Sequence, residues 1–315
     1  MGYIIGSFNI QKLGEAAVKQ LRRDFSLIAK VIKEERMDIV ALQEIFGNLK
    51  EHRVVSFLQN HLNHLGTASW SAAYVKPLKS NEGYAFLWNT SRIGLLPDKK
   101  YPGQFKEPQT VDNEGIYDHC DFIRPPAVGR FIPVGLMTPF IEIRVINTHV
   151  YHGGEDTAQT IAQRLREYQM LSDHIFARTA KMRDGYFRPA YTFIAGDYNL
   201  AQALCESALL ARRNPEMEMH CLQGRVTTIG TRIDPETQNE VTEYTANDYD
   251  HFTCSSRECK YLNYIGRIDA PNVYCGGDFN RYKKDVSDHV PIKLHLELRQ
   301  RNIAAPITTA VSTSN

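Results

Sequence analysis

Short apolar runs that end in polar residues recur along this chain, and they limit its fold more than any other feature. Asn9 follows YIIGSF, Glu44 follows DIVALQ, and His149 follows IRVINT. Asp197 and Asn199 follow YTFIAG in the same way. Because strand ends from different sheets can converge on one face, we expect these side chains to meet in a single pocket.

Periodicity predicts an alternation of strands and helices around these residues. Strands are predicted at 3–10, 38–42, 70–75, 83–89, 127–134, 139–148, 191–196 and 290–297. Helices are predicted at 13–36, 49–65 and 155–180. Strands and helices alternate at the start of the chain, whereas consecutive strands are predicted in its middle. We therefore expect two packed sheets flanked by helices rather than one doubly wound sheet.

The length and composition fit one globular domain. The chain has 315 residues, of which 43% are hydrophobic, and this is enough for a large core. No linker interrupts residues 1–300, so a single domain is expected there, followed by a disordered tail at 301–315. No signal peptide or membrane span is predicted, and the six cysteines lack a CxxC pair. These features favour free thiols in a reducing, cytoplasmic setting without a membrane partner.

The net charge of the chain does not indicate which kind of partner it binds. The 37 basic and 36 acidic residues leave a formal charge of +1, so a nucleic acid would need a local basic patch. Cations alternate with aromatic residues between Arg257 and Lys284, and such a mixture can hold a backbone and stack bases. The simpler interpretation is a solvated loop, because basic surface runs are common without a partner.

The same motifs contain the groups that a phosphoester hydrolase needs. Mg²⁺ prefers oxygen ligands from Asp, Glu and Asn, and these residue types recur at the strand ends. The SDH segment at 287–289 adds another carboxylate and imidazole directly before VPIKLHL. His149 and His289 each need a carboxylate to fix the ring tautomer, and Glu82 and Asp250 are the candidates. Asp248 is a competing candidate for the role of Asp250.

Seven segments, in the expected order, resemble sequence motifs of the endonuclease/exonuclease/phosphatase superfamily. Their residues are most similar to those of its deoxyribonuclease I branch. The segments are SFNIQ, LQE, NEGYAFLW, NTHV, GDYN, NDYDHF and SDHVPI, and they span residues 7–292. Any one segment would recur by chance, but seven in order make a specific pattern. The resemblance implies a four-layered α/β sandwich, with two central mixed β-sheets flanked by helices, which agrees with the predicted strands and helices.

The resemblance also implies which residues form the metal and phosphate pocket. Glu44 would be the principal metal carboxylate, and Asn9 and Asp288 would complete a Mg²⁺ site, with Mn²⁺ or Ca²⁺ as alternative ions. Asp197 would act in catalysis, and Asn199 would contact the substrate together with Asn9.

Two histidines would flank the scissile phosphate by the same resemblance. His289, oriented by Asp250, would activate water, and His149, oriented by Glu82, would assist the phosphate or the leaving group, although these roles could be exchanged. Arg124, in the segment FIRPPAVGRF, would contact a phosphate near the cut.

These expectations predict a Mg²⁺-dependent endonuclease that hydrolyses DNA phosphodiester bonds with low sequence specificity. Ser80 and Phe46 stand where the resemblance calls for the aromatic residue and the arginine that read the minor groove, so duplex binding in that style is in doubt. A phosphatase or phospholipase acting on an inositol phosphate or sphingomyelin headgroup is the first alternative, because one scaffold serves many esters. A catalytically silent binding module is the second. The oligomeric state is not predicted.

Overall fold

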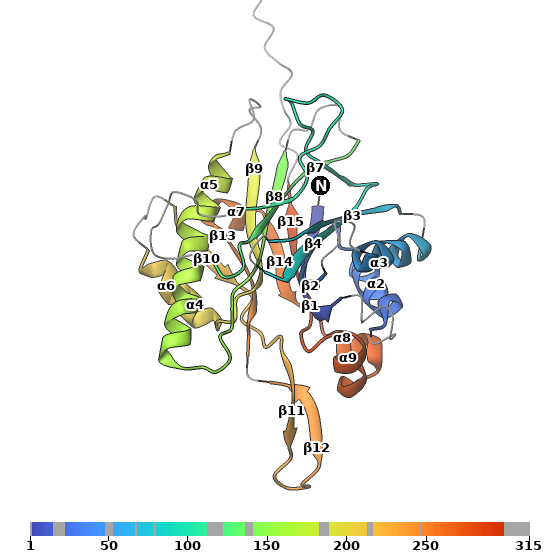
Figure 1. Ribbon diagram of the computed structural model, residues 1–315, viewed down its shortest axis with the longest axis vertical. Helices are drawn as coiled ribbons and strands as arrows, with labels where there is room; N and C mark the ends of the chain where they lie inside the picture. The colour runs from blue at the N-terminus through green and yellow to red at the C-terminus, as the bar shows by residue number, and fades with distance from the viewer. Residues whose placement is uncertain are drawn as a thin grey trace, which may run out of the picture.

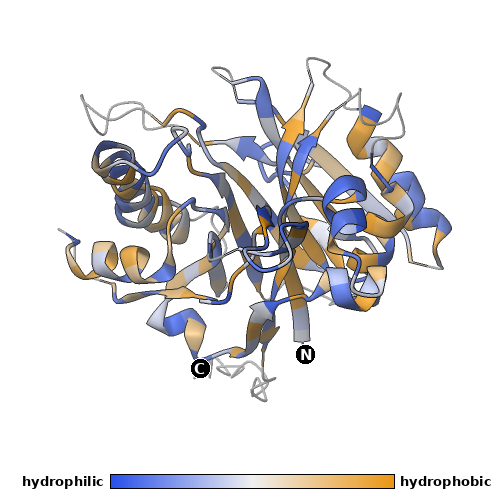
Figure 2. Ribbon diagram, turned by 90° about the horizontal axis from the view of Figure 1, so that it is seen from below, coloured by the Kyte–Doolittle hydropathy of each residue, from blue (hydrophilic) through white to orange (hydrophobic). Residues whose placement is uncertain are grey.

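Two β-sheets pack face to face, and helices cover both outer sides. The computed structural model describes residues 2–14, 23–47, 53–66, 68–77, 80–111, 122–135, 141–182, 189–212, 217–245 and 247–298. The layers follow one another across the molecule in Figures 1 and 2, with helices at either side of the strands. The predicted four-layered α/β sandwich is therefore confirmed. The predicted tail at 301–315 lies outside the described residues.

The first sheet has six strands in the order β14-β15-β1-β2-β4-β3. Their bounds are β1 Gly2–Leu13, β2 Ile39–Phe46, β3 Trp70–Val75, β4 Glu82–Asn89, β14 Leu262–Arg267 and β15 Ile292–Glu297. β1 and β2 are parallel, whereas the other neighbours are antiparallel. The sheet is therefore mixed, as expected.

The second sheet follows the order β10-β13-β9-β8-β7-β5, with the short β6 paired to β7. The bounds are β5 Ile93–Leu95, β6 Gln109–Thr110, β7 Ala127–Pro133, β8 Glu142–His149, β9 Ala190–Asp197, β10 Met219–Leu222 and β13 Asp250–Ser255. β8 and β9 are its parallel pair. A separate hairpin, formed by β11 Ile229–Ile233 and β12 Glu240–Tyr244, projects from the body of the protein (Figure 1).

The helices divide between the two outer faces (Figure 1). The first sheet is covered by α2 Phe25–Glu34, α3 Arg53–His64, α8 Ala270–Cys275 and α9 Phe279–Asp285. The second is covered by α4 Ala158–Met170, the π-helical turn η1 Leu171–Phe176, α5 Ala177–Lys181 and α6 Gln202–Leu210, and α7 Ser256–Cys259 follows β13. Among the described residues, no helix is both long and apolar enough to span a membrane.

Three apolar interfaces hold the four layers together. Ile28 of α2 and Leu58 of α3 are buried against the first sheet, and Phe176 of η1 is buried against the second. Between the sheets, Phe86 and Phe131 place their ring centroids 5.8 Å apart. Because both faces of each sheet are covered, the strands read as nearly continuous apolar runs in the sequence.

One edge of the sandwich collects the polar strand ends. Asn9, His149 and Asp197 stand toward the carboxyl ends of β1, β8 and β9, whereas β4 and β13 run the other way and begin with Glu82 and Asp250. Asp197 is in register with His149 on one side and with Asp250 on the other. The strand directions thus bring distant parts of the sequence to the same edge.

Two helix predictions were wrong at their first residues, because capping side chains set the starts. The helix predicted from residue 13 begins at Phe25, where Asp24 Oδ1 accepts a hydrogen bond from Leu27 N at 2.9 Å. Leu13 is the last residue of β1, and residues 15–22 lie outside the described part. The helix predicted from residue 155 begins after Thr157, which forms a reciprocal capping box with Thr160.

We expect Thr157→Ala to lower the free energy of unfolding by about 1 kcal/mol. Thr157 Oγ1 accepts from Thr160 N at 3.2 Å, and Thr160 Oγ1 accepts from Thr157 N at 3.0 Å. Alanine removes the first of these bonds and leaves an amide at the start of α4 without its protein acceptor. Urea denaturation measures the difference, and Thr157→Ser is the control that keeps the hydroxyl. Equal loss in both variants would contradict a capping role.

Candidate active site

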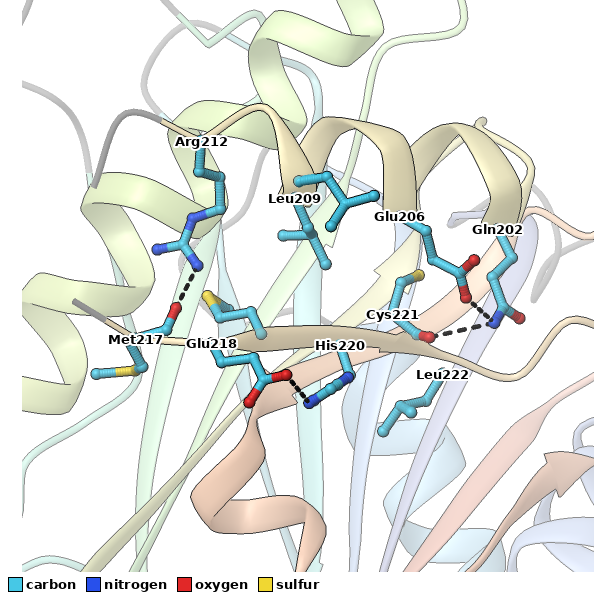
Figure 3. A pocket seen from close by; sticks show the side chains of 11 residues that line it. Gln202, Glu206, Leu209, Arg212, Met217, Glu218, His220, Cys221 and Leu222 are labelled. Carbon is cyan, nitrogen blue, oxygen red and sulfur yellow. Dashed lines mark hydrogen bonds and ion pairs between the residues drawn. The ribbon is translucent and has the colours of Figure 1, made fainter. Parts of the chain in front are cut away.

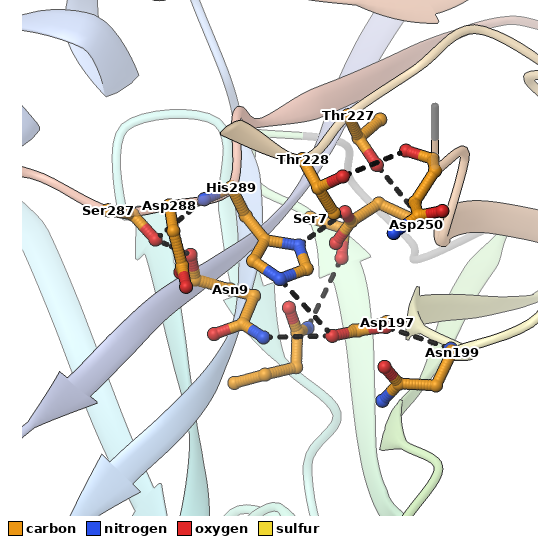
Figure 4. Close-up of polar contacts among 12 residues, drawn as sticks. Ser7, Asn9, Asp197, Asn199, Thr227, Thr228, Asp250, Ser287, Asp288 and His289 are labelled. Atoms are coloured by element: carbon orange, nitrogen blue, oxygen red, sulfur yellow. Dashed lines mark hydrogen bonds and ion pairs between the residues drawn. The ribbon is translucent and has the colours of Figure 1, made fainter. Parts of the chain in front are cut away.

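Asp197 lies at the centre of the polar edge, between the two sheets. Its Oδ2 accepts a hydrogen bond from Asn9 Nδ2 at 3.0 Å (Figure 4). The same oxygen is 3.6 Å from Nε2 of His149 and 3.6 Å from Nε2 of His289. His149 ends β8 of the second sheet, and His289 precedes β15 of the first. Two imidazoles from opposite sheets therefore face one carboxylate.

His149 is held by Glu82 from the opposite sheet. Its Nδ1 donates to Glu82 Oε1, and its backbone N–H donates to Tyr84 Oη at 3.3 Å. Burial acts to lower the pKa of His149, but the hydrogen bond to Glu82 and the charges of Glu82 and Asp197 outweigh it and raise the pKa. The bond at Nδ1 directs Nε2 toward the centre of the site.

His289 has the same arrangement with Asp250. Its Nδ1 lies 2.7 Å from Asp250 Oδ2, and its backbone N–H donates to Ser287 Oγ at 3.1 Å (Figure 4). Burial opposes protonation of the ring, yet the charges of Asp250 and Asp197 raise the pKa of His289 well above its ordinary value. Asp250 N in turn donates to Thr227 Oγ1 at 3.2 Å.

The competing candidate Asp248 is engaged elsewhere. Its Oδ2 accepts from Gln202 N, the first residue of α6, at 3.0 Å. Of the two acids, it is Asp250 that contacts the imidazole of His289. Asp197, Asp250 and His289 also bring one polar atom each within 4.8 Å of the others, although the Asp250 and His289 atoms are already paired.

Oxygens suited to a hard cation lie beside this centre. Glu44 Oε1 accepts from Asn9 Nδ2 at 3.1 Å, and Glu44 Oε2 accepts from Lys12 N at 3.0 Å. Within the described residues, Asn9 Oδ1 and Asp288 Oδ1 are buried and have no hydrogen-bond partner. Burial raises the pKa of Asp288. A buried acceptor without a donor is costly, so these oxygens fit a bound cation.

Arg124 and Asn199 flank the centre from the second sheet's side. Arg124 Nη2 lies 2.9 Å from Glu82 Oε2, and its guanidinium stacks on Tyr151 at 5.3 Å from the ring centroid. Arg124 Nη1 is buried without a partner among the described residues. Asn199 donates from its backbone N–H to Asp197 Oδ1 at 2.9 Å and from Nδ2 to Val150 O at 2.8 Å. Asn199 thus holds the loop after β9, and Arg124 has a free donor.

The backbone is strained at two of these residues. Glu44 has φ of 58° and Asn199 has φ of 48°, which are left-handed values that cost little for Asn and more for Glu. Such strain concentrates at functional sites, where the surrounding contacts maintain it. Just before Asp197 in β9, a Cβ at Gly196 would collide with Thr148 O, so the β8–β9 approach requires glycine there.

Sequence reasoning missed Gln11 and Arg23. Gln11 Nε2 donates to Asp288 Oδ2, and Arg23 Nη2 donates at 2.8 Å to both Gln11 Oε1 and Gln11 O. Arg23 Nη1 also donates to the carbonyls of Lys283 and Lys284. The signal for Gln11 was its position two residues after Asn9, which places both on one face of β1. Arg23 gave no signal, because its partners are far away in sequence.

The basic, aromatic segment before SDH is not one surface. Arg257 Nη2 donates to Ala190 O at the start of β9, and Tyr261 packs edge-on against Tyr191, at the end of the sheet opposite Asp197. Arg267 lies nearer the site, where its Nη1 donates to Val226 O at 2.8 Å. The stretch from Arg257 to Tyr261 therefore lies away from the site, whereas Lys283 and Lys284 are held beside it through Arg23, so the segment does not form one continuous surface.

The order and geometry of these residues agree with a known family. The model of the endonuclease/exonuclease/phosphatase family matches residues 6–289. The chain belongs to this family. Its members are hydrolases of phosphodiesters or phosphate esters and generally depend on a divalent metal, so this family member is a hydrolase of that broad type. Comparison with curated proteins gave no match.

Solved structures of the endonuclease/exonuclease/phosphatase family have the same fold. A member from Bacteroides vulgatus is 16% identical with a TM-score of 0.57, covering 95% of this chain and 100% of that one. The mannosyl-6-phosphatase of Bacteroides thetaiotaomicron is 14% identical with a TM-score of 0.55, covering 94% and 100%. TDP2 of D. rerio, complexed with single strand DNA product, is 12% identical with a TM-score of 0.55, covering 94% and 99%.

Proposed function

We propose that this protein is a Mg²⁺-dependent phosphodiesterase that cleaves DNA with low sequence specificity. The observation that supports this function is the pair of histidines, each bonded to its own carboxylate, that face Asp197 from opposite sheets. Hydrolysis of a phosphodiester requires an activated water, relief of charge on the phosphate, and help for the leaving alkoxide. The site offers a group for each task.

Glu44, Asn9 and Asp288 would hold the Mg²⁺ ion. The unpartnered oxygens of Asn9 and Asp288 and the carboxylate of Glu44 are hard ligands of the kind that Mg²⁺ prefers, and Mn²⁺ or Ca²⁺ could replace it. When bound, the ion supplies a positive charge that neutralises the phosphate oxygens and the developing negative charge.

The two histidines would divide the proton transfers. The negative charge of Asp288 is one of the charges that raise the pKa of His289. A cation bound to Asp288 would offset this charge and lower the pKa, which favours the neutral ring. A neutral His289, oriented by Asp250, can take a proton from the attacking water at Nε2. Because Glu82 raises the pKa of His149, its protonated ring can give the Nε2 proton to the leaving oxygen. Arg124 Nη1 would bind a phosphate oxygen, together with the Asn199 side chain.

DNA as the substrate is supported by the two-histidine arrangement and by fold similarity to TDP2, which was solved with a single strand DNA product. A phosphodiester has a poor alkoxide leaving group, for which a protonated imidazole such as His149 is well suited. Because the basic segment is split, DNA contacts would come from groups beside the site, and Arg124 Nη1 is one candidate for a phosphate contact.

A smaller phosphoester is the second candidate, and the β11–β12 hairpin favours it. The hairpin adjoins the site, since Ile229 N donates to Asp288 O at 2.7 Å. The hairpin has one basic residue, Arg232, and four acidic residues, which are Asp234, Glu236, Glu240 and Glu243. An acidic projection repels a long polyanion more than a small one. The mannosyl-6-phosphatase with a similar fold acts on a phosphate of a sugar.

Incubation of supercoiled plasmid with the protein and Mg²⁺ tests the proposal. We expect nicking that disappears with EDTA and in a His149→Ala variant. Nicking that survives the substitution would indicate a contaminating nuclease. In parallel, p-nitrophenyl phosphate and bis-p-nitrophenyl phosphate report on monoester and diester hydrolysis. Activity on the monoester without plasmid nicking would replace the first candidate by the second.

Gln11→Ala should weaken the apparent affinity for Mg²⁺ about 10–100-fold, as loss of a residue that orients a metal ligand typically does. Gln11 bonds Asp288, and Arg23 fixes Gln11 in turn. The measurement is the Mg²⁺ concentration that gives half-maximal activity, and saturating Mg²⁺ should restore most of the rate. Gln104→Ala, at an exposed position, is the control. An unchanged Mg²⁺ requirement would contradict this orienting role.

A further inference from the structure

Two thiols and one imidazole meet on the outer face of the second sheet, away from Asp197. They are Cys205 of α6, Cys221 of β10 and His251 of β13. One donor atom from each lies within 4.8 Å of the others. All three side chains are buried, with Cys221 2% exposed and the other two 0%. The proposed hydrolysis uses none of them.

The hydrogen bonds of His251 fix its protonation. Its Nδ1 is 2.8 Å from Gln223 O, and its Nε2 is 2.9 Å from Leu200 O. A carbonyl oxygen can only accept, so both ring nitrogens must carry a hydrogen. His251 is therefore an imidazolium in a fully buried position. A buried positive charge is costly unless a negative group lies beside it.

The Cys221 sulfur is the group best placed to carry that negative charge. The sulfur of Cys205 and a ring nitrogen of His251 lie within 4.8 Å of it. Burial by itself would raise the pKa of Cys221, but the hydrogen bond from Cys205 and the charge of His251 lower it to about 7. The charge of His251 therefore favours the thiolate form of Cys221, although the sulfur sits in an apolar core.

A cavity lies next to this residue. It has a volume of about 590 Å³ and lies between α6 and β10, where Gln202, Glu206, His220 and Cys221 are among its lining residues. Figure 3 shows Cys221 beneath α6, with its sulfur directed toward the helix. The cavity is wide enough for a peroxide, which is little larger than two water molecules.

We propose that Cys221 and Cys205 form a peroxide-reactive dithiol, in which Cys221 is the nucleophile and Cys205 the resolving thiol. The Cys221 thiolate attacks one peroxide oxygen, the O–O bond breaks, and the departing oxygen leaves as water or an alcohol after taking up a proton. Cys221 becomes a sulfenic acid, oxidised by two electrons, while the peroxide is reduced. Cys205 sulfur then attacks Cys221 sulfur, and the S–O bond breaks. Water leaves with the Cys205 proton, and a disulfide remains.

A soft metal is the rival occupant of the same cluster. Two thiols and an imidazole are common zinc ligands, but an imidazole must offer a lone pair to a metal. Both nitrogens of His251 point at carbonyl oxygens instead. The hydrogen-bond geometry thus favours the ion pair and the dithiol over a metal site.

Peptide mapping after hydrogen peroxide treatment tests the dithiol. The folded full-length protein is treated with substoichiometric to slight excess peroxide, quenched with an alkylating reagent and digested. We expect two peptides joined by a disulfide between Cys205 and Cys221. The mass of the joined pair should be lower by two hydrogens than the summed masses of the separate peptides, and a reductant should restore the separate peptides. The pair Cys254 and Cys259, whose sulfurs are 3.3 Å apart, serves as the internal comparison. Crosslinking at that pair alone would overturn the proposal.

Two variants separate the roles of the three residues. Cys205→Ser should stop the reaction at the sulfenic acid of Cys221, which a dimedone-type reagent traps by mass. His251→Gln should slow peroxide consumption about tenfold at pH 7, because the thiol returns toward its ordinary pKa of about 8.5. Cys275→Ser, on α8 at the other sheet, should change neither result. The proposal would be overturned if the purified protein contained stoichiometric zinc that is lost in Cys221→Ser. It would also be overturned if Cys205→Ser formed no sulfenic acid. Neither result depends on whether His251→Gln folds.

Discussion

Replacement of His289 by alanine should lower kcat for the phosphodiesterase reaction by about 10²–10⁴-fold, the usual contribution of a positioned acid–base group. The imidazole is buried, bonded to Asp250 at 2.7 Å and 3.6 Å from Asp197. Alanine removes the group that would accept the proton of water, and the carboxylate of Asp197 is a much weaker base than an imidazole. Steady-state hydrolysis of bis-p-nitrophenyl phosphate at saturating Mg²⁺ measures the loss.

Two further variants distinguish chemistry at His289 from a structural effect. Asp250→Asn keeps the imidazole but removes the charge that fixes its tautomer, so kcat should fall with little change in KM. His295→Ala, six residues further along on β15, removes a histidine that does not face the site and should retain wild-type kcat. Near-normal activity of His289→Ala would remove His289 from the mechanism, and partial rescue by added imidazole would support its role.

Glu44→Gln should lower kcat/KM by about 10³-fold, since the charge stabilisation that a divalent ion gives is worth several kcal/mol. Glu44 stands at a strained backbone position, φ of 58°, and its carboxylate oxygens are bonded to Asn9 and to the backbone of Lys12. Glutamine keeps the size and the first hydrogen bond but loses the negative charge that attracts the ion. Calorimetric titration with Mn²⁺ measures metal binding independently of activity.

The control for Glu44→Gln is Glu34→Gln, on the exposed side of α2, where the carboxylate pairs with Lys30 at 3.9 Å. Surface pairs of this kind contribute little to stability, so activity and Mn²⁺ binding should stay at wild-type levels. If Glu44→Gln bound Mn²⁺ as tightly as the wild type, the metal site would have to be assigned to other carboxylates.

The order of strands and the residues at their ends could be predicted because these depend on local sequence. Alternating or continuous apolar residues predicted the strands at 70–75, 83–89 and 191–196 to within a residue or two of β3, β4 and β9. The pairs His149 with Glu82 and His289 with Asp250 are in contact, as the sequence led us to expect. Their catalytic roles stay predictions until the substitutions above are made.

Elements after residue 200 were mostly missed, because many of these segments are short and several lack a regular apolar pattern. Most side chains of β11 and β12 are exposed or only partly buried, and α8 and α9 have six and seven residues. Such segments have little periodicity to recognise. Their conformation follows from contacts such as Tyr282 Oη donating to His289 O at 3.1 Å, which only the folded chain provides.

The sequence by itself determined the family, the two-sheet architecture and the set of acids, amides and imidazoles at the strand ends, because motif order and apolar periodicity are properties of neighbouring residues. Only the tertiary structure decided that both imidazoles face Asp197, that Gln11 and Arg23 support Asp288, and that His251 is bonded at both nitrogens. The physical reason is distance along the chain: Asn9 and Asp197 are 188 residues apart, and their hydrogen bond exists only once the two sheets have packed.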